Sequence, residues 1–165
     1  LTVPPHVHAS TAHMPFRRIV CAVDFSEWSL AALEMAAALA EPNRATLVAV
    51  HAVEWPWAEP PAPSFDELPP AQAAALREYR RYITDRAAHR LDTTVRDVVG
   101  GRCEVACEVV HGKPHVELLR LANDQAADLV ALGVHGRSTL DVAVFGSTTN
   151  QVVRHAGCPV LTVRR

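Results

Sequence analysis

The sequence predicts an α/β fold in which a doubly wound, five-stranded parallel sheet carries helices on both faces. Five short, nearly continuous apolar runs alternate with segments whose apolar residues recur at helical spacing, the pattern of strands joined by crossover helices. The chain has 165 residues, of which 49% are hydrophobic, enough for one domain around one sheet. With right-handed crossovers, we expect the strand order 3-2-1-4-5.

Each expected strand is an apolar run bounded by polar or turn-forming residues, as in parallel strands that are buried on both faces. The expected strands are residues 17–23, 45–53, 103–110, 128–134 and 159–165. In the third strand, Cys103 and Cys107 fall on one face. Two thiols at this spacing are better interpreted as buried free cysteines than as a zinc site.

The helices are indicated by apolar periodicity and by their end signals. They are expected after Asp24–Glu27, over residues 71–99, from Pro114 onward and over residues 147–156. Pro42 and Asn43 should end the first helix, and Gly100–Gly101 the second. The second helix has one apolar stripe, formed by Leu76, Tyr79, Ile83, Ala87, Leu91, Val95 and Val98.

Two segments show no periodicity. Residues 1–15 hold prolines and histidines and are expected to form a flexible arm ahead of a domain over residues 16–165. Residues 54–70 hold six prolines together with Trp55 and Trp57, which predicts a long loop within the domain. That loop could be a tether, or a flap that places a tryptophan against a ligand.

Composition excludes several functions. The formal net charge is −2, so no basic field favours nucleic acid. No apolar run reaches the roughly 20 residues of a membrane span, and no signal peptide opens the chain, so we expect a cytoplasmic protein.

The fold predicts where a ligand should bind. In a doubly wound sheet the ligand lies beyond the carboxyl ends of the strands, where the strand order reverses. For the order 3-2-1-4-5 this point lies between the first and fourth strands. The site should therefore follow residues 23 and 132.

A glycine pattern, G-x2-G-x9-G-[ST], begins at the end of the fourth strand with Gly133, Gly136, Gly146 and Ser147. Glycines allow close backbone approach, and the start of a helix offers unpaired N–H groups to an anion. The alternative is an ordinary glycine loop in which Ser147 caps the helix.

Asp24 follows the first strand, on the other side of the predicted crevice. It could cap the next helix, with Glu27 completing a capping box. Alternatively, its carboxylate could accept hydrogen bonds from a ribose or hold a metal-bound water near phosphate. Both roles need the same position, so the residues leave them open.

Over residues 16–165 the chain resembles the universal stress protein family. The resemblance rests on IVCAVDFSE, His51-Ala52-Val53, GKP at 112–114, the glycine pattern and CPVLTV, in that order. It implies a Rossmann-like fold, commonly dimeric, and membership of the subgroup that binds ATP, in which Mg could accompany the phosphates. An exposed last strand would suit pairing with a second copy.

The resemblance also implies the residues of an ATP site. Asp24 would contact the sugar side, Ala22 would line the pocket, and the backbone at Ala52 would meet the adenine edge. The residues around the phosphates would be Gly133, His135, Gly136, Arg137, Gly146, Ser147, Thr148 and Thr149. Ala22 departs from the proline that is frequent in ATP-binding relatives.

Other functions are less consistent with the residues. The third strand ends Val109-Val110-His111, without the aspartate that a phosphoacceptor domain requires. Two alternatives stay open: a dimeric interaction protein of the same fold that binds no ATP, and a slow ATPase. With only His135 and Asp24 as candidate bases, no catalytic residue is assigned and turnover is expected to be negligible or very slow.

Overall fold

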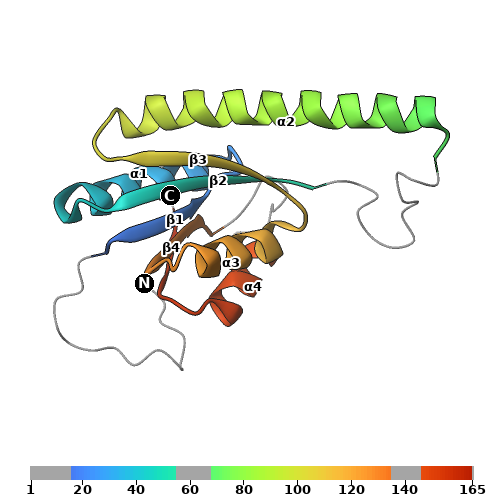
Figure 1. The fold of residues 1–165 in the computed structure, drawn as a ribbon. Coiled ribbons are helices and arrows are strands. Elements are labelled where there is room, and N and C mark those ends of the chain that lie inside the picture. The colour runs from blue at the N-terminus through green and yellow to red at the C-terminus, as the bar shows by residue number, and fades with distance from the viewer. Residues whose placement is uncertain (1–15, 55–67, 135–145, 165) are drawn as a thin grey trace.

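The computed structural model describes residues 16–54, 68–134 and 146–164, which form the predicted fold (Figure 1). Within these ranges the strands are β1 (Arg18–Ala22), β2 (Thr46–Val53), β3 (Val105–His111), β4 (Leu129–Gly133) and β5 (Val160–Val163). The helices are α1 (Glu27–Asn43), α2 (Pro70–Val99), α3 (Pro114–Asp124) and α4 (Ser147–His155). All neighbouring strands pair in parallel in the order β3-β2-β1-β4-β5, which confirms the predicted topology.

Alternating side chains of the central strands enter two separate cores. Ile19 and Cys21 of β1 face α1 and α2, and Val20 between them faces α3 and α4. All three are fully buried, because helices cover both faces of the sheet. This two-sided burial explains why the strands read as continuous apolar runs rather than as alternating ones.

Helix α1 ends at Asn43, as predicted, but its start differs from the alternative in which Asp24 caps it. Its N-cap is Ser26, whose Oγ accepts a hydrogen bond from Ser29 N–H at 3.2 Å, so Asp24 does not cap the helix and Glu27 is its first residue. At the other end the helix continues through Pro42 to Asn43. A proline in the last turn removes only one backbone hydrogen bond.

Helix α2 extends well beyond the ends of the strands it covers (Figure 1). Its thirty residues span about 45 Å, whereas an eight-residue strand spans about 26 Å. Leu91 and Val95 are buried against the sheet, but Tyr79 is 51% exposed, so the predicted stripe is buried only toward the C-terminal half. The N-terminal half overhangs the carboxyl edge of the sheet.

The described cysteines are all free thiols. Cys103 precedes β3, so it does not share a strand face with Cys107 as predicted, although both pack against the same core. Burial raises the pKa of the Cys21 thiol to about 12. Among the described residues, no group of three or more potential metal-ligating side chains converges, and no helix combines the length and hydropathy of a bilayer span.

The N-terminal arm and nearly all of the 54–70 segment lie outside the described residues. The position of Trp55 or Trp57 relative to a ligand therefore stays a sequence-based prediction.

Candidate functional site

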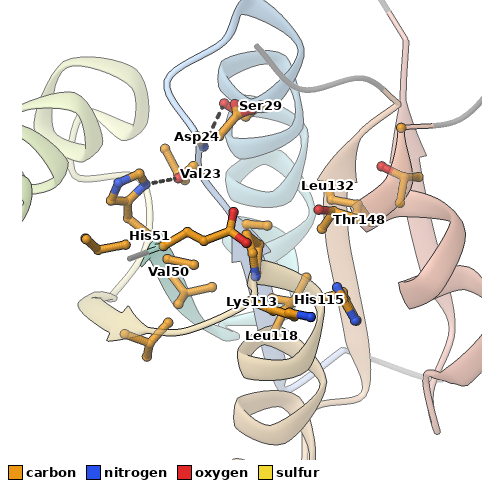
Figure 2. A pocket seen from close by; sticks show the side chains of 18 of the residues that line it. Val23, Asp24, Ser29, Val50, His51, Lys113, His115, Leu118, Leu132 and Thr148 are labelled. Carbon is orange, nitrogen blue, oxygen red and sulfur yellow. Dashed lines mark hydrogen bonds between the residues drawn. The ribbon is translucent and has the colours of Figure 1, made fainter. Parts of the chain in front are cut away.

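A pocket of about 840 Å³ opens at the carboxyl edge of the sheet, at the predicted switch point between β1 and β4 (Figure 2). This volume lies toward the upper end of the range for small-molecule sites. The pocket reaches from Ile83 and Ala87 of α2, across the strand ends, to the first residues of α3 and α4. It is therefore bounded by elements from both faces of the sheet.

The structure brings together eight of the residues expected from the sequence. The lining includes Ala22, Asp24, Ala52, Gly133, Gly146, Ser147, Thr148 and Thr149. The other three expected residues, His135, Gly136 and Arg137, lie outside the described part of the chain. Two segments more than 100 positions apart in the sequence thus meet at one pocket.

The β1–α1 turn holds Asp24 through a small hydrogen-bond network. Asp24 Oδ1 accepts from Ser26 N–H at 2.9 Å and from Ser26 Oγ at 2.5 Å. Asp24 N–H donates to Ser29 Oγ at 3.3 Å, which in turn donates to Ser26 O at 3.0 Å. The carboxylate therefore orients the true N-cap, Ser26, instead of capping the helix itself, and these bonds fix its place in the lining of the pocket.

An aromatic and cationic stack supports the same turn. Phe25 adopts φ 64°, a left-handed conformation that is costly for a bulky side chain. Its ring centroid lies 4.5 Å from that of His51, and the Arg90 guanidinium carbon lies 4.0 Å from the Phe25 centroid. These contacts from β2 and α2 offset the backbone strain and join the turn to two other elements.

His51 of β2 is packed and hydrogen-bonded. It is 8% exposed, and its Nδ1 lies 2.7 Å from Val23 O. A carbonyl oxygen can only accept, so Nδ1 carries the proton in this bond. His51 also lines the pocket, beside the expected adenine contact at Ala52.

Gly133 serves packing between a helix and a strand. A Cβ on this residue would lie 2.7 Å from Trp28 Cβ, 2.8 Å from Trp28 C and 3.0 Å from Ser29 N. Only a glycine therefore lets the first turn of α1 approach the end of β4. The sequence suggested close approach of a ligand, but the atoms that require this glycine belong to the protein.

Thr149 connects the start of α4 to Gly133. Its Oγ1 donates to Gly133 O at 2.9 Å, and the side chain is buried. Its hydroxyl thus has a structural partner, whereas Ser147 and Thr148 also line the pocket and have no such bond among the described contacts. Thr149 positions the helix start from which the other two project.

The start of α4 is left without a side-chain cap. The N-cap is Gly146, so the alternative in which Ser147 caps the helix is wrong. Gly146 N–H donates to Val134 O at 3.0 Å, which anchors the turn to β4. The N–H groups of a helix's first turn have no intrahelical acceptor and meet the positive end of the helix dipole, so this end of the pocket suits an anion.

The pocket has one wall that the site prediction did not include. Lys113 and His115 at the start of α3 line it, together with Gln151 of α4 and Glu54 after β2. Lys113 belongs to the GKP segment and His115 follows it, but neither was among the expected site residues. His111, by contrast, is not among the lining residues; its Nε2 lies 3.1 Å from Thr84 Oγ1 of α2, and burial lowers its pKa.

The sheet order and the pocket at its switch point define a Rossmann-like α/β protein with a candidate ligand pocket at the carboxyl edge. The chain belongs to the universal stress protein family, whose family model matches residues 15–164.

Relatives agree with this assignment over most of the chain. A universal stress protein of Thermus aquaticus is 30% identical over 149 residues, which cover 90% of this chain and 99% of the relative. Universal stress protein MJ0577 of Methanocaldococcus jannaschii is 28% identical over 88 residues, so this match spans about half of each protein, 53% and 54% respectively.

Solved structures share the fold. Universal stress protein UspA from Lactobacillus plantarum superposes with a TM-score of 0.67 at 26% identity, covering 90% of this chain and 98% of that one. A universal stress protein in complex with cAMP gives a TM-score of 0.59 at 23% identity, covering 90% and 97%. One from Archaeoglobus fulgidus in complex with dAMP gives 0.53 at 18% identity, covering 92% and 100%.

Proposed function

We propose that this chain is an ATP-binding universal stress protein that acts as a nucleotide-responsive regulatory module in stress response. One observation carries the proposal: a pocket of about 840 Å³ runs from apolar side chains on α2 to the start of α4, which has no side-chain cap. Such a pocket is apolar at one end and suited to anions at the other. A nucleotide has the same polarity.

The apolar end suits the base. Ile83 and Ala87 of α2 and Val53 of β2 line it, and the backbone at Ala52 offers hydrogen-bonding groups at the edge of the sheet. A planar purine can pack against the aliphatic side chains while its edge pairs with backbone groups.

The middle of the pocket suits the ribose. A carboxylate has about four lone-pair positions, and the bonds from Ser26 use Oδ1 of Asp24. A sugar hydroxyl can donate to the same carboxylate. Because the Ser26 and Ser29 contacts fix Asp24 beforehand, this contact needs little reordering of the turn.

The start of α4 suits the phosphates. First-turn N–H groups at Ser147 and Thr148 can donate to phosphate oxygens, and Thr149 holds the helix start through Gly133. His135, Gly136 and Arg137 complete the proposed set. Mg²⁺ is proposed only as a companion of the phosphates, held by them and by water, since no described carboxylate cluster would bind it alone.

Two further features belong to the proposal. β5 is an edge strand of the described sheet, and we propose that a second copy pairs with it to form a homodimer. The four free thiols suit the reducing cytoplasm, where ATP is available. The complexes of two universal stress proteins with cAMP and dAMP support adenine nucleotides as the ligand class.

Titration calorimetry tests this function. Wild-type protein should bind ATP, and Asp24→Asn and Asp24→Ala should weaken binding by about tenfold or more, the loss of one hydrogen bond to a charged group. Asp124→Ala removes an exposed carboxylate outside the pocket and should bind as wild type. Absence of ATP, ADP and AMP binding by folded wild-type protein would favour the interaction protein without nucleotide, and phosphate release in the same samples would reveal a slow ATPase.

A further inference from the structure

Lys113 is the single lysine of this chain, against fifteen arginines, and it lines the pocket from the start of α3 (Figure 2). Its backbone is fixed as the N-cap of α3, where its carbonyl accepts from Val116 N–H at 3.0 Å and Glu117 N–H at 3.1 Å. Its side chain takes no part in capping. The ammonium group is therefore carried by a rigid helix start.

Gly112 sets the direction in which the backbone enters Lys113. Gly112 has φ 143°, a conformation that favours glycine, and its N–H donates to Val53 O at 3.1 Å. The turn from β3 into α3 is thereby held against the end of β2, which also lines the pocket.

The charges around the pocket are unequal. Among the lining residues that the structure describes, Asp24 and Glu54 carry carboxylates, and Lys113 is the one permanently cationic side chain. A phosphate brought against two carboxylates is repelled, and in a partly desolvated pocket this repulsion is weakly screened. A lysine in the same pocket offsets one of these two negative charges and supplies hydrogen-bond donors to an anion.

Lys113 also lies on the face of the sheet that carries α4, whose start is the expected phosphate site. Helices α3 and α4 pack against each other on one face of the sheet, with shared core residues such as Leu118 and Val152. α2, which supplies the apolar wall for the base, covers the opposite face. The first residues of α3 and α4 thus line the pocket from the same face of the sheet.

We infer that Lys113 is a phosphate-binding residue of this pocket, which donates its ammonium hydrogens to the ligand from the wall opposite Asp24 and favours phosphorylated over unphosphorylated adenosine. This inference rests on the proposed nucleotide site, and it assigns the charge recognition to a residue outside the glycine pattern.

The experiment compares AMP with adenosine, which differ by the phosphate alone. Binding to wild type, Lys113→Gln, Lys113→Arg and Arg120→Gln is measured by titration calorimetry at low and high salt. Arg120→Gln is the matched control, since it removes the same charge from the same helix at an exposed position that does not line the pocket.

Lys113→Gln should weaken AMP binding by about tenfold or more and leave adenosine binding unchanged, as expected for one charge-assisted hydrogen bond. It should also reduce the salt dependence of AMP binding, and Lys113→Arg should retain most of the affinity. Equal losses for AMP and adenosine, or wild-type AMP affinity in Lys113→Gln, would overturn the inference while the nucleotide site stands. If wild type binds neither AMP, ADP nor ATP, the proposed function itself fails, and this inference fails with it.

Discussion

Replacing Gly133 with alanine tests the junction on which the whole pocket depends. The added methyl would lie 2.7 Å from Trp28 Cβ and 2.8 Å from the backbone carbon of Trp28. Backbone atoms cannot rotate away as the end of a flexible side chain can, so α1 must shift. Forcing an extra carbon into a packed site costs about 1–3 kcal/mol, and the lower entropy of the unfolded alanine chain offsets this by about 0.4–1 kcal/mol.

We therefore expect Gly133→Ala to lower the free energy of unfolding by about 1–2 kcal/mol, or Tm by about 2–8 °C for a domain of this size. ATP binding should weaken as well, since Ser29 and Asp24 move with the first turn of α1. Urea unfolding and titration calorimetry measure the two effects.

Gly157 provides the control for this substitution. A Cβ there would meet nothing within 4 Å, so Gly157→Ala should leave stability unchanged or slightly raised. If Gly133→Ala is as stable as Gly157→Ala and binds ATP normally, the steric explanation of Gly133 is wrong.

Three further predictions concern side chains of α4, of the β1–α1 turn and of the core. Thr149→Val should cost about 1–3 kcal/mol in urea unfolding because Gly133 O loses a buried partner, whereas Thr148→Val should be nearly neutral; equal effects would contradict the assigned hydrogen bond. Ser26→Ala should cost about 1 kcal/mol as a lost N-cap, while Ser147→Ala, at a helix capped by Gly146, should change stability by less than about 0.5 kcal/mol. Burial raises the pKa of Cys21 from 9.0 to about 12, so the folded state resists thiol ionisation; stability should be intact below about pH 9 and fall as pH rises toward 12, by several kcal/mol at most. Cys21→Ala should flatten the plot of unfolding free energy against pH between about pH 9 and 12. An unchanged slope would show that ionisation of the Cys21 thiol does not cause the loss of stability.

The sheet order and the position of the pocket could be predicted because they follow from patterns that extend over many residues. Residues 17–23 and 128–134 read as strands buried on both faces, and the structure places β1 and β4 side by side within these ranges. Once the order is fixed, Asp24 and Gly133 must meet at the carboxyl edge. No single side-chain contact was needed for that conclusion.

Individual roles could not be predicted where they depend on contacts between distant elements. The need for glycine at 133 arises from Trp28, which is known only when α1 is seen to cross the end of β4. Asp24 and Ser26 are both good N-cap residues two positions apart, and only the backbone conformation decides between them. The Arg90–Phe25–His51 stack joins α2 to the β1–α1 turn across 65 positions and leaves no local pattern.

In the proposed function, the β1–α1 turn and the start of α4 enclose one nucleotide. Titrating isotope-labelled protein with ATP and following the backbone amide resonances tests this most directly. The largest shifts should occur together at residues 22–29 and 146–149, with one affinity. Shifts confined to one of these segments, or located elsewhere on the domain, would contradict it.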